Sequence, residues 1–165
     1  MKVIVLSDTH MPRKAKALPK ILQKDLEQSD LIIHAGDFQS LDSYYELKSF
    51  GKLVGVKGNV DTLELQALLE EKQLLTLNGI SIGVVHGHGS KLTTEKRAIA
   101  AFEGIKTECI IFGHSHIPIL KYVDGTLLFN PGSPTDKRRQ QSYSYGILTL
   151  NSEIHAEHVF FDHKE

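Results

Sequence analysis

Ile110-Ile111-Phe112-Gly113-His114-Ser115-His116 is the stretch on which the interpretation of this chain depends. Its apolar residues are typical of a buried strand, which stops at a glycine followed by two histidines two positions apart. In extended backbone this spacing points both imidazoles to the same side. The glycine lets the backbone turn, and two converging neutral imidazoles suit a divalent transition metal. The alternative to a metal site is that one of these histidines packs in the core and the other faces solvent. The choice between the two interpretations depends on the rest of the chain.

Composition limits the class of protein. The 165 residues fit one domain, 1–165, and 41% hydrophobic with 24% charged residues are typical of a soluble globular protein. A net charge of -1 gives no overall field that attracts nucleic acid or an anionic membrane, although a localised positive site is compatible with it. The lone Cys109 excludes an intrachain disulfide, and no segment is typical of a signal peptide or a membrane span. We therefore expect a cytoplasmic protein.

The first half of the chain alternates strand and helix patterns. The predicted strands cover 2–6, 31–33 and 52–56, and the predicted helices cover 18–27, 40–48 and 63–72. Three such units in succession predict a parallel sheet with right-handed crossovers, in which ligands bind beyond the carboxyl ends of the strands.

The second half of the chain is richer in strands. Three turn signals predict hairpins that join 74–77 to 80–85, 119–123 to 127–129, and 143–150 to 154–161. A helix is predicted over 93–102, before a strand over 109–112. We therefore expect one α/β domain.

Side chains that bind metals follow five of these strands. They are Asp8 and His10, Asp37, Asn59, His86, and His114 with His116. A single octahedral ion takes six ligands. Seven donors at one sheet edge are therefore explained most economically by two metals. Each residue alone is equally compatible with a polar loop, but their joint placement favours a site.

The chain resembles the calcineurin-like metallophosphoesterase superfamily. The family's motifs are present in order as Asp8-Thr9-His10, Gly36-Asp37, Gly58-Asn59, His86 and Gly113-His114-Ser115-His116. The short length and the tail motif Asn130-Pro131-Gly132-Ser133 resemble its small bacterial and archaeal phosphodiesterase branch. The resemblance implies a four-layer α-β-β-α sandwich, in which two mixed central sheets are flanked by helices.

The resemblance also assigns the ligands. One metal is placed on Asp8, His10, Asp37 and His116, and the other on Asp37, Asn59, His86 and His114, with Asp37 as the bridge. The implied cofactor is two divalent ions, Mn²⁺ first, with Ni²⁺, Zn²⁺ and Fe²⁺ as alternatives. Two ions beside two carboxylates leave a positive site that attracts an anionic phosphate ester. The implied activity is a phosphodiesterase in which a bridging hydroxide attacks a small phosphate ester in line, with Asp37 and Asn59 catalytic and Asn59 also binding substrate.

One position departs from the family pattern. Many members have a histidine directly after the motif asparagine, where it stabilises the transition state or protonates the leaving group, but this chain has Val60. His88 is the nearest replacement as a catalytic and substrate-binding residue, although a supporting or solvent position is equally compatible. Asp61 is expected to cap the following helix, with orientation of a ligand histidine as the alternative, and His34 is expected to pack in the core. The histidines expected at the surface are His155, His158 and His163.

Two other functions on this fold stay open. The first is a non-catalytic protein-interaction scaffold, because the retromer scaffold subunit resembles this fold, but part of the metal set is degraded in that lineage and intact here. The second is a nuclease. A near-neutral chain without a basic, aromatic-interleaved patch favours a small substrate over nucleic acid. We expect no membrane partner, and a homo-oligomer is compatible with the sequence.

Overall fold

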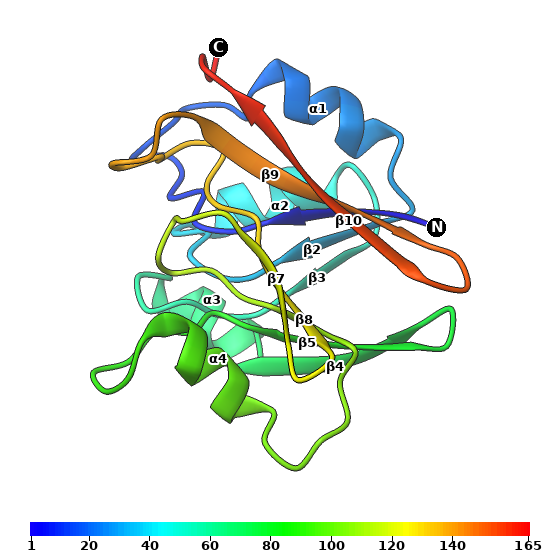
Figure 1. Cartoon of the computed structure of the whole chain (residues 1–165). Coiled ribbons are helices and arrows are strands. Elements are labelled where there is room, and N and C mark those ends of the chain that lie inside the picture. The colour runs from blue at the N-terminus through cyan, green and yellow to red at the C-terminus, as the bar shows by residue number, and fades with distance from the viewer.

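The computed structural model describes residues 1–165 as two five-stranded sheets packed face to face (Figure 1). The first sheet runs β10 (Ile154–Phe161), β9 (Tyr143–Leu150), β1 (Lys2–Leu6), β2 (Leu31–His34) and β3 (Leu53–Gly55). The second runs β4 (Lys72–Leu77), β5 (Ile80–Val85), β6 (Cys109–Ile111), β8 (Thr126–Asn130) and β7 (Ile119–Val123). Both are mixed, since β1-β2-β3 and β5-β6-β8 are parallel and the outer pairs antiparallel.

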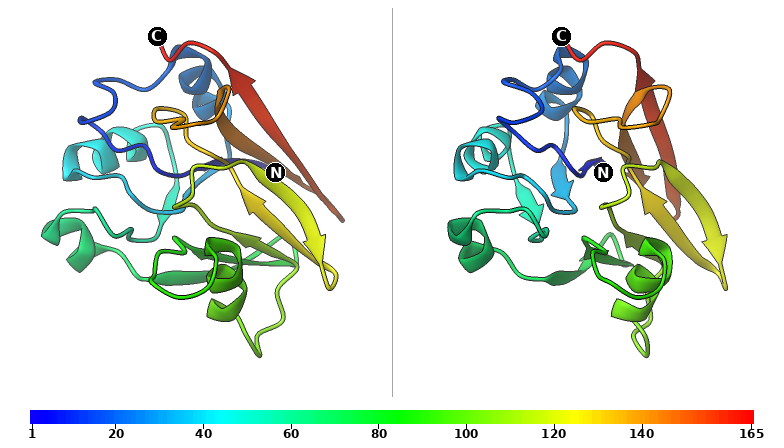
Figure 2. Two further views of the ribbon diagram at one scale, coloured as in Figure 1. Left: turned by 60° about the vertical axis from the view of Figure 1, so that its left-hand side comes forward. Right: turned by 90° about the vertical axis from the view of Figure 1, so that its left-hand side faces the viewer.

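Helices cover both outer faces, which completes the predicted four layers (Figure 2). The helices are α1 (Lys20–Glu27), α2 (Leu41–Lys48), α3 (Leu63–Leu68) and α4 (Thr94–Ala101). Residues of α1, α2 and α3 pack on the first sheet, and residues of α4 pack on the second. No helix combines the length and the apolar character needed to cross a membrane.

Strand alternation builds the cores. In β1, Val3 and Val5 enter the core between the sheets, while Ile4 and Leu6 face the helices on the other side. Cys109 lies in the core between the sheets as a small buried side chain. The strands thus bury both faces, which agrees with their nearly continuous apolar sequences.

Three of the sequence predictions were wrong in detail. The helix predicted over 63–72 ends at Leu68, because Lys72–Leu77 pairs with β5 along its whole length and buries Leu75 and Leu77 against the core. The helix predicted from Leu18 begins at Lys20, because Pro19 still has an extended ψ of 138°. His158 is half-buried rather than on the surface: its ring stacks on Phe129 with centroids 4.7 Å apart.

The topology brings distant loops to one end of the sandwich. The loop after β1 bonds to the loop after β2, since the Asp8 N–H donates to Gly36 O at 3.0 Å. The loop after β6 bonds to the loop after β5, since the Gly113 N–H donates to His86 O at 3.0 Å. The His114 N–H then joins the two sheets by donating to Asp8 Oδ2 at 2.9 Å. The predicted ligands therefore meet at the carboxyl ends of parallel strands from both sheets.

Candidate metal centre

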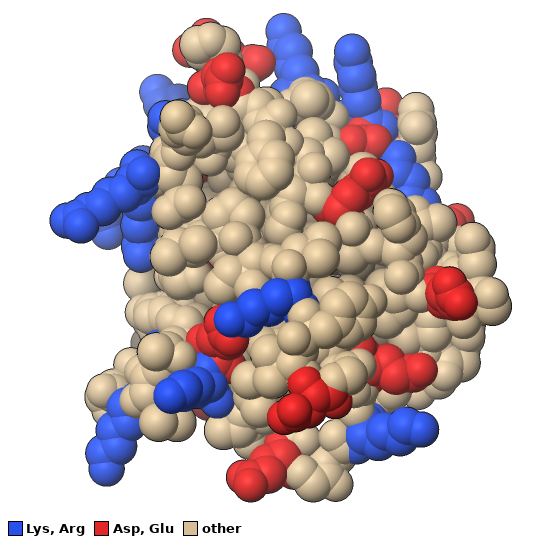
Figure 3. Space-filling model, viewed as in Figure 1, with Lys and Arg blue, Asp and Glu red and all other residues tan.

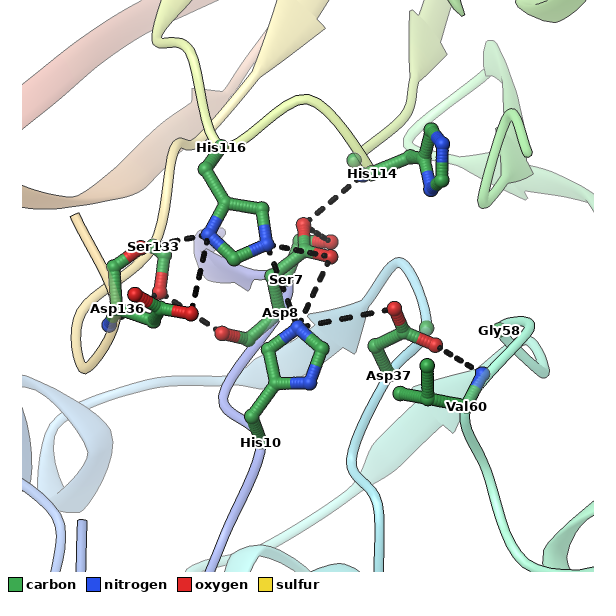
Figure 4. A network of polar contacts seen from close by, with 12 residues as sticks. Ser7, Asp8, His10, Asp37, Gly58, Val60, His114, His116, Ser133 and Asp136 are labelled. Atoms are coloured by element: carbon green, nitrogen blue, oxygen red, sulfur yellow. Dashed lines mark hydrogen bonds and ion pairs between the residues drawn. The ribbon is translucent and has the colours of Figure 1, made fainter. Parts of the chain in front are cut away.

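Two clusters of metal-type side chains form at this end of the sandwich (Figure 4). The first cluster is Asp8, His10 and His116, and the second is Asp37, His86 and His114. Within each cluster the ligating atoms lie within 4.8 Å of one another. Each cluster thus offers carboxylate oxygen and imidazole nitrogen, the mixed donor set that first-row divalent metals bind.

Asp37 joins the two clusters. Its Oδ2 lies 3.1 Å from His86 Nε2 in its own cluster and 3.7 Å from His10 Nε2 in the first cluster. Asn59 adds a neutral oxygen to the second cluster, since its Oδ1 lies 3.1 Å from His86 Nε2. All seven residues predicted as ligands are therefore brought together, and the arrangement suits a carboxylate shared between two ions.

A buried carboxylate oxygen tests whether the residues fit a cation. Asp8 Oδ2 accepts from the Ser7 hydroxyl at 2.7 Å and from the His114 N–H at 2.9 Å. Asp8 Oδ1 is buried without any hydrogen-bond partner. Around it the Nε2 atoms of His116 and His10 lie 3.4 and 3.7 Å away. A buried charged oxygen without a partner is costly, and a cation held between it and the imidazoles removes that cost.

The backbone at the ligand residues is not extended. The spacing of Asp8 with His10, and of His114 with His116, predicts extended backbone with both side chains on one side, and that prediction was wrong. Five ligand residues have left-handed backbone, with φ between 44° and 68°: Asp8, His10, Asp37, His114 and His116. The chain therefore bends at each of these residues, and His114 and His116 enter different clusters. Such conformations cost about 1–3 kcal/mol each and are concentrated at functional sites.

Two glycines permit close approach around the carboxylates. A Cβ at Gly58 would lie 2.0 Å from Asp37 Oδ1, and a Cβ at Gly113 would lie 1.8 Å from Ser7 Oγ. Any side chain at either position would push the neighbouring ligand loop away. Steric crowding thus explains why the Gly-Asn and Gly-His motifs have glycine at these positions.

Asp61 supports the ligand loops, so its predicted role as a helix cap is wrong. Its carboxylate accepts from the backbone N–H groups of Gly58 and Asp37 at 2.7 and 3.1 Å, and from that of Gln39 at 2.7 Å. The cap of α3 is Thr62, which makes no side-chain cap bond. An Asp before a helix usually caps it, so the sequence favoured the cap over this support of the ligand loops.

Backbone carbonyls orient two ligand imidazoles. His86 Nδ1 bonds Ala35 O at 2.7 Å, and His116 Nδ1 bonds Asp136 O at 2.6 Å. Each bond places a proton on Nδ1, so that Nε2, which faces the carboxylates of the centre, is the nitrogen that would bind a metal. These carbonyl partners come from other loops and were not predictable from the sequence.

Burial and charge set the protonation of the metal-free centre. Burial raises the pKa of Asp8, but the nearby imidazoles of His86, His10 and His116 outweigh it and hold that pKa well below its usual range. Burial lowers the pKa of His86, but the Asp8 and Asp37 carboxylates raise it to about 9. Burial and the charge on His86 lower the pKa of His114 to about 4. A metal bound through His86 at neutral pH would therefore have to displace a proton from this imidazole.

His88 and Val60 both lie next to the centre. The His88 ring centroid lies 5.5 Å from that of His86 and 6.4 Å from that of His114, and its Nδ1 is buried without a hydrogen-bond partner. Val60 is 44% exposed, and its backbone N–H donates to Asp37 Oδ1 at 3.0 Å. His34 packs as expected, stacked on Phe38 with centroids 3.6 Å apart.

The fold and the clusters define the class: an α/β sandwich protein with a candidate divalent-metal centre where its two sheets meet. The chain belongs to the calcineurin-like phosphoesterase superfamily, whose domain model matches residues 1–153. It is 38% identical over 143 residues to "Probable metallophosphoesterase MJ0623" of Methanocaldococcus jannaschii, covering 84% of this chain and 70% of that protein. It is 34% identical over 164 residues to "Probable metallophosphoesterase YsnB" of Bacillus subtilis, covering 98% and 91% of the two chains.

Two other similar proteins carry different descriptions. A phosphodiesterase of Methanocaldococcus jannaschii, MJ0936, is 25% identical over 146 residues, covering 80% of this chain and 83% of that protein. The crystal structure of wild-type Vps29 from Entamoeba histolytica, complexed with zinc, superposes with a TM-score of 0.75 at 22% identity and covers 98% of this chain and 100% of that one. The Vps29 likeness shows the fold alone.

Proposed function

We propose that this protein is a binuclear metal-dependent phosphodiesterase that hydrolyses a small phosphate ester, with Mn²⁺ as the working metal. Membership of the phosphoesterase superfamily and similarity to a phosphodiesterase support the proposal. The observation that carries it is Asp37, whose Oδ2 faces His10 of one cluster and His86 of the other. Two ions bound there would supply an activated water and positive charge for the phosphoryl oxygens.

In this proposal the residues of the chain hold and orient the metals. The first metal would be held by Asp8, His10, Asp37 and His116, and the second by Asp37, Asn59, His86 and His114. The hydrogen bond from the Val60 N–H to Asp37 Oδ1 leaves Oδ2 of the bridge directed at both clusters. Asn59 is exposed beside His86, so its amide is also available to a bound ester.

His88 is the proposed partner of the leaving group. Burial and the charge on His86 lower the pKa of His88, so its imidazole is neutral at pH 7. A neutral imidazole acts by donating a hydrogen bond to the departing oxygen rather than by bringing a full positive charge. His88 also borders a cavity of about 580 Å³ that Arg97 and Glu71 help to line, which gives the leaving group space next to the second cluster.

The test is hydrolysis of bis(4-nitrophenyl) phosphate by protein freed of metal with a chelator and then reloaded with Mn²⁺. We expect chelation to abolish turnover and Mn²⁺ to restore it. Full turnover by protein shown to be metal-free would refute the proposal. Cleavage of single-stranded DNA in preference to the diester would assign the site to a nuclease, and metal binding without hydrolysis of any ester would favour a scaffold.

A further inference from the structure

A cavity of about 500 Å³ opens beside the first cluster, and His88 is not among the residues that line it. His10 forms part of its wall, so the cavity reaches the candidate metal centre itself. Figure 4 shows His10 between Asp136 and Val60, which also line this cavity. We call it the His10 pocket.

The charge of the His10 pocket is positive. Its lining includes the side chains of Arg13, Lys14 and Arg138 and a single carboxylate, Asp136. Lys14 Nζ lies 3.7 Å from Asp136 Oδ2, whereas Arg13 and Arg138 form no ion pair or side-chain hydrogen bond. Figure 3 shows Lys and Arg side chains gathered at the edge of the molecule formed by the loops before α1 and β9. Two guanidinium groups without an ion-pair partner therefore lie next to the candidate metal centre, although the protein as a whole is nearly neutral.

The pocket is built on the loops that hold the metal ligands. The Lys14 N–H donates to His10 O at 2.8 Å, so Arg13 lies inside a tight turn that begins at a ligand. On the other side, Asp136 O accepts from His116 Nδ1 at 2.6 Å, and Arg138 follows two residues later. The two arginines are thus fixed close to the first cluster through the same backbone that orients His10 and His116.

A neutral amide and a short apolar side chain complete the pocket lining. The Gln39 side chain lines it, and its buried Oε1 has no hydrogen-bond partner. Val60 presents a short side chain, and the residue is 44% exposed. A group bound at the first cluster can therefore extend past Val60 toward Arg13 and Arg138.

We propose that the His10 pocket binds a second phosphoryl group of the substrate, so that the preferred substrate is a small diester carrying a further phosphate. This inference rests on the proposed function of the metal centre. Guanidinium groups match phosphate geometry with paired N–H donors, which suits two free arginines better than it suits a neutral ester arm. The pocket has no aromatic platform of Phe, Tyr or Trp on which successive bases would stack, so a small molecule fits better than a nucleic acid strand.

The experiment compares two chromogenic diesters that differ only in the second phosphate. They are thymidine 5′-(4-nitrophenyl phosphate) and the same compound with a 3′-phosphate. The variant is Arg13→Gln combined with Arg138→Gln, which removes two charges without breaking any side-chain contact. The matched control is Arg139→Gln, an exposed neighbour outside the pocket lining.

We expect wild type and the control to prefer the 3′-phosphorylated ester by about tenfold in kcat/KM at low salt, because two exposed charge pairs each contribute a few-fold. The double variant should lose this preference, because its rate on the 3′-phosphorylated ester should fall much more than its rate on the ester without the 3′-phosphate. Equal rates on both esters in wild type, or an unchanged preference in the double variant, would overturn the inference while leaving the phosphodiesterase proposal intact.

A binding measurement keeps the two proposals separable. Calorimetry with Mn²⁺-loaded protein compares thymidine 3′,5′-bisphosphate with thymidine 5′-monophosphate, neither of which is a diester, so the measurement does not depend on diester hydrolysis. Tighter binding of the bisphosphate to wild type, lost in the double variant, supports the pocket even where neither ester is hydrolysed. Equal binding of the two nucleotides overturns it. Stronger competition by single-stranded oligothymidylate than by the bisphosphate would assign the arginines to a strand instead.

Discussion

Asp61→Asn tests whether one carboxylate holds the ligand loops in place. Asp61 accepts three backbone N–H bonds, from Gly58 and Asp37 on one oxygen and from Gln39 on the other. An asparagine side chain has a single acceptor oxygen. Directed at Gly58 and Asp37, that oxygen keeps two bonds, and the new NH₂ group then faces the Gln39 N–H.

The expected cost follows from these contacts. One buried N–H without a partner costs about 1–3 kcal/mol, and the two remaining bonds lose the strengthening that a charged acceptor gives. We expect a loss of about 2–4 kcal/mol in the free energy of unfolding of the metal-free protein, or about 5–12 °C in Tm. Because the Asp37 and Gly58 backbones shift together, metal affinity should fall by about 10–100-fold.

Urea unfolding of chelator-treated protein measures the stability, and calorimetric titration with Mn²⁺ measures the affinity. The matched control is Asp124→Asn in an exposed hairpin turn, where the left-handed φ of 49° suits either residue. A stability within about 0.5 kcal/mol of wild type, together with unchanged Mn²⁺ affinity, would show that Asp61 does not support the loops.

Three further predictions concern single residues. Asp37→Asn should lose Mn²⁺ and lower kcat/KM by about a thousandfold or more. In the control His163→Ala, at an exposed position, metal content and kcat/KM should change little. Equal behaviour of the two variants refutes the ligand assignment. Val60→His should raise turnover of alkyl phosphate esters more than that of nitrophenyl esters, because aryl leaving groups need no proton. The difference between the two substrate classes should be about tenfold at most. A wild-type rate that does not depend on leaving-group basicity contradicts this prediction. Burial lowers the pKa of His34 to about 3, so its stabilising contribution is complete above about pH 6.5 and is lost as the pH falls toward 3. In His34→Asn, which cannot be protonated but keeps an acceptor for the Gly36 N–H, urea unfolding should depend less on pH across this range; an unchanged slope rejects the assignment.

The order of strands and helices was predictable because it depends on local patterns. The Asn78-Gly79 turn has φ of 49° and 77°, as the predicted hairpin requires, and the parallel pairing of β1 with β2 follows from the strand-helix alternation. The position of β9 was not predictable. It pairs antiparallel with β1, with Thr149 opposite Lys2, and this pairing joins strands from the two ends of the chain.

The types of ligand residue were also predictable, but their local geometry was not. Periodicity describes strands up to Leu6 and Ile111, and the ligands begin where the strands end. There the backbone turns left-handed at Asp8 and His114, a conformation that neither residue prefers on its own. Only contacts between loops hold it, and such contacts leave no periodic trace in the sequence.

The tail after β8 supplies some of those contacts. Ser133 Oγ donates to Asp8 O at 2.8 Å, and Thr135 Oγ1 donates to Thr9 O at 2.6 Å. Asn130 Nδ2 donates to Gly113 O at 3.0 Å, beside the His114 ligand. The Asn-Pro-Gly-Ser motif, which contributes no ligand, thus ties the loops after β1 and β6 together. Because these bonds hold the strained ligand backbones through the protein's own side chains, they reduce the ordering that ion binding would require.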